Sequence, residues 1–129
     1  MKIGLDTGFI LGFYLQDEGV LRWWERIMEK GWVPVTSILC GYEFFKVLLV
    51  RGYRFEELEE FWRKLENACE VVEVSGGQIR EGARLEARYR LGAMDSLILA
   101  GFLEAGCRKV FTTDGRWKER VRKIKIAII

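Results

Sequence analysis

Residues 93–114 read AMDSLILAGFLEAGCRKVFTTD, and this stretch decides the fold class. Residues 94–105 are apolar on nearly every side, which predicts a helix buried in the middle of a domain. Residues 108–112 then form a short, largely apolar run that predicts a strand ending before the Asp114-Gly115 turn. A buried helix that leads directly into a strand is typical of a parallel sheet covered by helices.

The rest of the chain alternates between short apolar runs and amphipathic stretches. The apolar runs predict strands at 2–5, 32–35, 71–74 and 124–129. The amphipathic stretches predict helices at 18–30, 38–50, 56–68, 78–91 and 116–123. A chain of 129 residues has the size of one domain. We therefore expect one α/β domain over residues 1–129, a three-layer α/β/α sandwich with a central parallel sheet.

Two neighbouring rows run along the helix predicted at 78–91. We expect one row to be lightly buried; it consists of Ile79, Ala83, Ala87 and Leu91. The other has one arginine per turn: Arg80, Arg84 and Arg88. We expect the arginines to form a solvated face with ion pairs to Glu81 and Glu86, and to contact an anion only secondarily.

The composition excludes several classes of chemistry. The chain has no histidine, which rules out Ser-His-Asp and Cys-His catalysis and histidine-ligated zinc. Cys40, Cys69 and Cys107 lie far apart in apolar surroundings, so we expect free thiols rather than disulfides. No apolar run approaches the ~20 residues of a membrane span, and the N-terminus lacks a signal-peptide pattern. We expect a soluble, cytoplasmic protein without membrane contact.

Two features of the sequence predict partners. Residues 1–75 are net acidic and residues 76–129 net basic, which suits an anionic partner such as nucleic acid, with a solvated face on the last helix as the alternative. Trp23 and Trp24 are adjacent in one amphipathic helix. We expect that one core face cannot hold both, and that they help form a surface for a partner or a second copy.

Four carboxylates stand where the apolar pattern gives no reason for a charge. Asp6 and Asp114 follow predicted strands, and the carboxyl ends of parallel strands form the ligand-binding edge of such sheets. Glu43 and Asp95 lie on helices apolar enough to pack against that sheet, where an unpartnered carboxylate is costly. Each acid also has a purely structural explanation, as a helix cap, a turn residue or, for Glu43, an ion-pair partner of Lys46.

Convergence of the four acids would have a chemical consequence. Like charges raise one another's pKa unless a cation neutralises them. Oxygen ligands without His or Cys favour hard ions, here Mg²⁺ or Mn²⁺. Such ions activate water and neutralise charge on a phosphate, so the acids point to hydrolysis of phosphate esters.

At these residues the chain resembles the PIN-domain nucleases. The matching features are Asp6-Thr7 after the first strand, Gly41-Tyr42-Glu43-Phe44, the apolar helix that Asp95 opens, and Thr112-Thr113-Asp114 followed by Trp117. Their order and spacing match along essentially the whole chain. Within that family, the short single-domain form is similar to VapC, the toxin of bacterial and archaeal toxin–antitoxin pairs.

The resemblance implies a metal-dependent ribonuclease that leaves 5′-phosphate ends. Its Mg²⁺ or Mn²⁺ site would consist of Asp6, Glu43, Asp95 and Asp114. The three aspartates would be the chief ligands, and Glu43 would bind or help to deprotonate a water molecule.

The resemblance also implies supporting residues and partners. Thr7 and Thr113 would hold the carboxylates or a water molecule in place. VapC-like members form a homodimer and bind a small antitoxin that covers the site. We expect Lys46, Arg116 and Lys118 to contact phosphates of the RNA substrate, because positive charge near the acids would offset them.

Two residues depart from the family's pattern, and other functions stay open. Gly8 stands where many members carry Ser or Asn, and Arg116 where some carry a further acid, which leaves enough acids for one firmly held ion. The alternatives are an RNA-processing nuclease without an antitoxin, a catalytically silent domain that binds nucleic acid or protein, and a phosphatase or DNA nuclease with the same metal chemistry.

Overall fold

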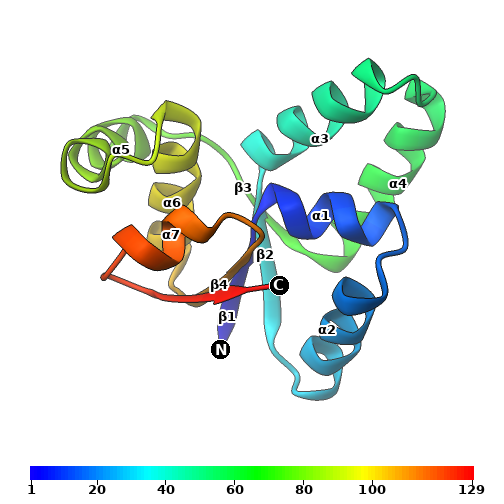
Figure 1. Ribbon diagram of the computed structural model, residues 1–129, viewed down its shortest axis with the longest axis horizontal. Coiled ribbons are helices and arrows are strands. Elements are labelled where there is room, and N and C mark those ends of the chain that lie inside the picture. Colours follow the sequence, from blue (N-terminus) through cyan, green and yellow to red (C-terminus); the bar gives the residue numbers. More distant parts are fainter.

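The computed structural model describes residues 1–129 as one five-stranded sheet with seven helices (Figure 1). The strands are β1 (Lys2–Leu5), β2 (Val33–Ser37), β3 (Glu70–Val72), β4 (Cys107–Thr112) and β5 (Lys125–Ile128). The helices are α1 (Thr7–Tyr14), α2 (Glu18–Glu29), α3 (Ile38–Val50), α4 (Phe55–Ala68), α5 (Gly76–Tyr89), α6 (Ala93–Ala105) and α7 (Gly115–Arg120). The predicted strands and helices are all present, with shifted ends, and α1 is an additional helix.

The sheet is parallel throughout, in the order β3-β2-β1-β4-β5. The strand β1 is central, with β2 and β4 as its neighbours. Leu5 pairs with Phe111. The residues that follow this pair, Asp6 and Thr112, therefore lie side by side at the carboxyl ends of two adjacent strands. This register brings the start and the end of the chain together at one edge of the sheet.

Helices cover both faces of the sheet, as predicted. Figure 1 shows α1 to α4 on one side of the strands and α5 to α7 on the other. The first layer buries Phe9 of α1 and Phe44 of α3 with Ile3 and Phe111 of the sheet. The second layer is centred on α6, which buries residues nearly all round, as its apolar sequence predicts.

The buried face of α5 differs from the predicted one. The buried residues are Gln78, Gly82, Leu85 and Tyr89, one or two positions before the members of the predicted row, and Ile79 is half exposed. Leu91 is buried beyond the end of the helix. Gly82 allows α5 to pack closely against Leu97 of α6, because a Cβ at position 82 would lie 2.8 Å from Leu97 Cδ2. The small residue lets α5 approach α6 closely, which a search for large apolar residues overlooks.

The arginine row of α5 is exposed, as predicted, but only one of the predicted ion pairs forms. Arg84 pairs with Glu81 at 3.8 Å. Glu86 instead accepts hydrogen bonds from the Gly92 N–H at 2.7 Å and the Ser96 hydroxyl at 3.0 Å. This acid therefore ties the end of α5 to the first turn of α6.

The tryptophans of α2, Trp23 and Trp24, are both half-buried, and the partner surface that we expect them to help form stays a prediction. The Trp23 ring lies 4.8 Å from that of Phe111, and the Trp24 ring lies 4.8 Å from that of Phe13. One core holds both because they pack against different elements. The three cysteines are free and buried, as predicted. No helix combines the length and the apolar character needed to cross a lipid bilayer.

Candidate functional site

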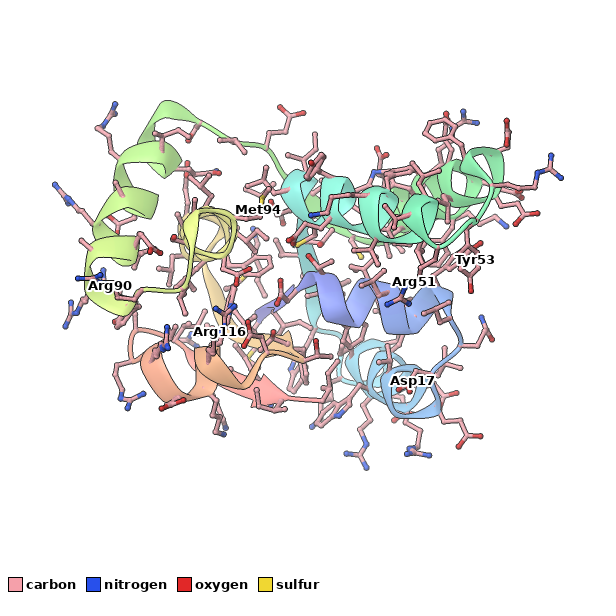
Figure 2. All side chains as sticks on the ribbon, turned by 45° about the horizontal axis from the view of Figure 1, so that its top comes forward. Asp17, Arg51, Tyr53, Arg90, Met94 and Arg116 are labelled. Atoms are coloured by element: carbon pink, nitrogen blue, oxygen red, sulfur yellow. The ribbon has the colours of Figure 1, made fainter.

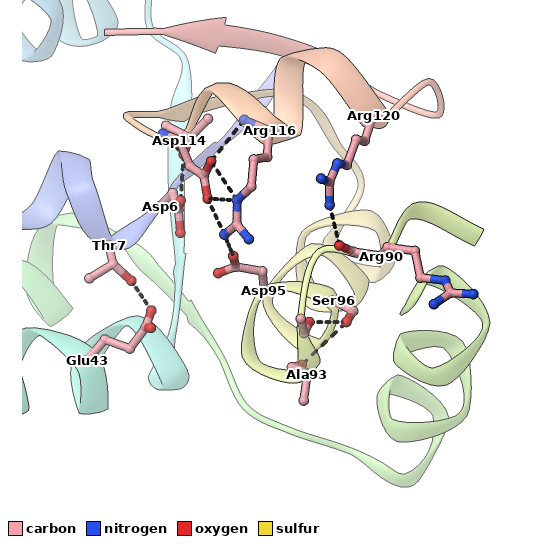
Figure 3. Close-up of polar contacts among 12 residues, drawn as sticks. Asp6, Thr7, Glu43, Arg90, Ala93, Asp95, Ser96, Asp114, Arg116 and Arg120 are labelled. Carbon is pink, nitrogen blue, oxygen red and sulfur yellow. Dashed lines mark hydrogen bonds and ion pairs between the residues drawn. The ribbon is translucent and has the colours of Figure 1, made fainter. Parts of the chain in front are cut away.

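The predicted acids lie on four elements around the carboxyl edge of the sheet (Figure 3). Asp6 follows β1 and precedes α1, while Asp114 follows β4 and precedes α7. Glu43 lies in α3, and Asp95 lies in the first turn of α6. The structure brings their charges within mutual influence: Asp6 is affected by Asp95 and Glu43, and Asp95 by Glu43 and Asp114.

Asp6 is the most deeply placed of the four acids, with only 6% of its surface exposed. The hydroxyl of Thr112 donates to its Oδ2 at 2.6 Å, whereas the buried Oδ1 has no hydrogen-bond partner. The pKa of Asp6 is raised to about 6, chiefly by burial and to a smaller extent by the charges of Asp95 and Glu43, while the Thr112 hydrogen bond acts in the opposite direction. The side chain does not cap α1, so capping does not explain a buried acid with a free oxygen.

We expect ionisation of Asp6 to destabilise the metal-free protein. The pKa is about 6 in the folded protein and 3.8 in the reference state, so the folded state binds more protons between these values. Stability from the protonated carboxyl is complete below pH 3.8 and is lost as pH rises through about 6. The free energy of unfolding should fall by roughly 2–3 kcal/mol across this window. Urea unfolding in EDTA at several pH values measures the fall.

The Asp6→Asn variant is the control for that titration, because its amide cannot ionise. Its unfolding free energy should lack this part of the pH dependence while other groups titrate as before. The same pH profile in both proteins would contradict the assignment.

Two threonines donate hydrogen bonds to two of the acids, and only one of these threonines, Thr7, is a predicted supporting residue. The Thr7 hydroxyl donates to Glu43 Oε1 at 2.5 Å, which joins α1 to α3 (Figure 3). The predicted Thr113 is exposed and makes no side-chain hydrogen bond; the buried neighbour Thr112 holds Asp6 instead. Thr112 points inward because strand side chains alternate between faces, and a run of two threonines leaves the choice open in the sequence.

Thr113 has a different contact, which explains Gly8. A Cβ at Gly8 would lie 2.1 Å from Thr113 Oγ1 and 2.9 Å from Thr113 Cβ. The absence of a side chain at Gly8 therefore lets the loop after β4 pack on the first turn of α1. The departure from the family's Ser or Asn is a packing requirement at this contact.

Arg116 lies inside the acid cluster. Its guanidinium donates to Asp114 Oδ2 at 2.7 Å and to Asp95 Oδ2 at 3.2 Å, while its Nε lies 3.1 Å from both Asp114 oxygens. Figure 2 shows Arg116 near the middle of the molecule and Arg90 at its margin. Hydrogen bonding by Arg116 lowers the pKa of Asp114, while burial raises that of Asp95. One cation thus bridges two of the four acids, and its contact with a substrate phosphate stays a prediction.

The two predicted lysines lie outside these contacts. Lys46 is exposed, with its ammonium 5.6 Å from the centre of the Tyr42 ring. It forms no ion pair with Glu43, so the structural explanation of that acid is wrong. Lys118 donates to the Ile126 carbonyl of β5 at 3.3 Å, which holds it away from the acid cluster.

Trp117 lies close enough to Asp95 to affect its pKa. It is fully buried, and its indole N–H has no hydrogen-bond partner. The N–H is nevertheless close enough to lower the pKa of Asp95 without the geometry of a hydrogen bond. The aromatic residue after the Thr-Thr-Asp turn therefore contributes polarity as well as volume.

The oxygen atoms of the four acids suit a hard cation, although Arg116 already neutralises part of their charge. No three His, Cys, Asp or Glu side chains are arranged to hold one ion, and Arg116 pairs with two of the four carboxylates. The residues still fit Mg²⁺ or Mn²⁺ chemically: all the donors are carboxylate oxygens, and Asp6 Oδ1 is buried without a partner. Ion binding would require Arg116 to release Asp95 and Asp114.

Known proteins share this chain's sequence pattern and fold. The family model described as PIN domain matches residues 3–123. No curated protein sequence matches the chain. VapBC2 from Rickettsia felis, bound to a promoter DNA fragment, has a TM-score of 0.79 at 12% identity over 100% of this chain and 99% of that one.

Two further structures are similar over nearly their full length. VapBC-1 from nontypeable Haemophilus influenzae has a TM-score of 0.77 at 16% identity, over 99% of this chain and 98% of that one. DNA-bound VapBC from Salmonella typhimurium has a TM-score of 0.74 at 17% identity, over 99% and 98%. At these identities the likeness shows a common fold.

Proposed function

Because the chain belongs to the PIN domain family, we propose that it is a Mg²⁺- or Mn²⁺-dependent endoribonuclease, the toxin of a VapBC-type pair. One observation supports the proposal most: four carboxylates near the carboxyl edge of the sheet influence one another's charge, and the deepest has a buried, unpartnered oxygen. A buried carboxylate oxygen without a hydrogen-bond partner destabilises the fold, so packing alone does not explain its presence.

In this proposal Asp6, Asp95 and Asp114 hold the ion, and Glu43 lies beside it. When bound, a divalent ion lowers the pKa of water and stabilises negative charge on a phosphate. Thr112 fixes Asp6 through its hydrogen bond, so that Oδ1 stays available. Thr7 fixes one oxygen of Glu43 and leaves the other able to accept a proton from the attacking water.

Arg116 has a second role once it leaves the acids. Its planar guanidinium suits a phosphate as well as a carboxylate. A substrate phosphate at this edge would offer the released arginine a new anionic partner. Lys46, exposed on α3, is a second candidate for a phosphate contact.

We propose a small antitoxin and a second copy of the chain as protein partners, and the cytoplasm as the place of action. The three solved structures above carry VapBC in their descriptions, which supports a paired antitoxin. Free, buried cysteines suit a reducing compartment. Sedimentation of the purified chain tests the dimer, and co-purification with the product of an adjacent small gene tests the antitoxin.

A catalytically silent domain that binds nucleic acid is the second candidate. Arg116 favours it, because an arginine that already neutralises two acids reduces the need for an ion. An RNA-processing nuclease without an antitoxin would use the same site as the toxin.

Cleavage of a mixed RNA by the purified chain, in Mg²⁺, Mn²⁺ or EDTA, tests the proposal. We expect cleavage with either ion and none in EDTA, and new 5′-phosphate ends. RNA that is bound but uncut with every ion would favour the silent domain. Cleavage of DNA or release of free phosphate, without RNA cleavage, would favour the other phosphate-ester hydrolases.

A further inference from the structure

A cationic surface with embedded aromatic rings lies on the α2 side of the sheet, apart from the acids. We call it the basic–aromatic face. Its cations are Arg22 and Arg26 of α2, Lys30 at the end of that helix, Lys109 of β4 and Lys125 of β5, and its rings are Trp23 and Trp32. Four of the five cations are exposed, and Lys109 is half-buried.

Cation–ring contacts connect this face from α2 to β4. The Lys109 ammonium lies 5.5 Å from the Trp23 ring centre and 5.7 Å from that of Trp32. Arg26 lies 5.2 Å from the Trp23 ring, and Lys30 lies 5.1 Å from the Trp32 ring. Both tryptophans are partly exposed, so each offers a ring edge or face beside two positive charges.

None of the five cations forms an ion pair, a property that they share with other cations of the chain such as Arg80 and Arg88. Burial lowers the pKa of Lys109, and the charges of Lys125, Lys30 and Lys118 lower it further. Lys30 and Lys125 lie close enough to Lys109 for their charges to repel it, while the acids of α2 form no ion pair with the cations of this face. These acids are Glu18, Glu25 and Glu29. A bound polyanion would relieve that repulsion.

The face is separate from the acid cluster. Lys109 is paired with Ile3 and with Lys125, and Trp32 directly precedes β2, which places the face towards the amino ends of the strands. Asp114 lies five residues beyond Lys109, about 16 Å along an extended chain. Figure 1 places α2 on the opposite side of the molecule from α5 and its arginine row.

We propose that the basic–aromatic face binds single-stranded RNA outside the cleavage site, with phosphates on its cations and bases against Trp23 or Trp32. The proposal rests on the proposed ribonuclease function. Rings between unpaired cations favour RNA over an acidic protein, because bases stack on aromatic side chains while phosphates meet the charges. Substrate bound here would be held to the protein by contacts that do not depend on the ion.

The test compares two triple variants that remove the same charge from two helices. One is Arg22→Gln/Arg26→Gln/Lys30→Gln on α2, and the control is Arg80→Gln/Arg84→Gln/Arg88→Gln on α5. Fluorescence anisotropy with a labelled single-stranded RNA, in EDTA and at several salt concentrations, gives the affinity without cleavage. We expect the α2 variant to bind at least about tenfold more weakly, with a slope of log K against log salt reduced by about 2, and the α5 variant to bind like wild type.

The melting temperature separates this loss from misfolding. Removal of unpaired like charges should leave the α2 variant at least as stable as wild type. The single variant Lys125→Glu, on a different element, should also weaken RNA binding several-fold and keeps the test valid if the triple variant does not fold.

Equal losses in the α2 and α5 triples would mean general electrostatic attraction and would overturn the proposal, as would no loss in the α2 variant. Polyglutamate that competes as well as RNA of equal charge would indicate an acidic protein partner and would overturn it too. If the α2 variant binds RNA normally and wild type still cleaves it with an ion, only the face is refuted. A wild-type chain that binds no RNA refutes the ribonuclease as well.

Discussion

Asp95→Asn should cleave RNA on the order of 10²–10³-fold more slowly than wild type in Mg²⁺ or Mn²⁺. Asp95 lies in the first turn of α6, between the influence of Glu43 and that of Asp114, with Trp117 beneath it. An amide has nearly the same shape but no charge, so α6 keeps its packing while the ion loses a ligand. Initial rates of RNA cleavage measure the change.

Binding should separate a damaged site from a damaged fold. We expect Asp95→Asn to bind RNA in EDTA at least as well as wild type, because the lost charge repels phosphates. Glu104→Gln removes a carboxylate from the far end of the same helix, where Glu104 contacts only the exposed Ser75 hydroxyl, and should cleave normally. Cleavage by Asp95→Asn at the wild-type rate would refute the assigned site.

Arg116→Ala should bind Mn²⁺ about three- to tenfold more tightly than wild type. In the free protein the guanidinium holds Asp95 and Asp114 at 3.2 and 2.7 Å, so an ion must displace it before it gains those oxygens. The Arg116 side chain is half exposed, and solvent-screened ion pairs are worth about 1 kcal/mol or less each, which sets this range. Titration calorimetry with Mn²⁺ measures affinity independently of cleavage.

Two further variants show whether the geometry of the Arg116 guanidinium or its charge is responsible for the change in Mn²⁺ affinity. Arg116→Lys keeps the charge but loses the planar fork, and its Mn²⁺ affinity should be intermediate. Arg120→Ala removes a cation one turn further along α7, where the guanidinium donates to the Arg90 carbonyl, and should change affinity little. Equal affinities in wild type and Arg116→Ala would show that Arg116 does not compete with the ion. Absence of Mn²⁺ binding in both would refute the metal site.

The layers of this fold could be predicted from the sequence because most elements have a clear periodicity. The buried helix α6 and the strand β4 are the best examples: an all-apolar helix and a short apolar strand have few other interpretations. The helix α1 could not be found in this way, because TGFILGFY has no polar face. The predicted buried row of α5 is wrong because two of the four buried residues, Gln78 and Gly82, are not large apolar residues.

The sequence identifies a candidate site residue where a carboxylate stands in an apolar segment. It does not distinguish between two neighbouring residues of the same type. Asp6 and Glu43 stand out because carboxylates rarely occur in such apolar segments. The choice between Thr112 and Thr113 depends on which side chain points inward, and that depends on the register of β4. The bridge made by Arg116 depends on the position of α7 relative to α6, which no local pattern contains.

The pairing of β1 with β4 has a consequence for the protein during its synthesis. Asp6 is synthesised 106 positions before its hydrogen-bond partner Thr112. A growing chain that ends before β4 has no strand on that side of β1 and no Asp114. Nascent and prematurely terminated chains of this kind therefore lack the complete acid cluster, and any hydrolytic activity starts only after Asp114 has been added.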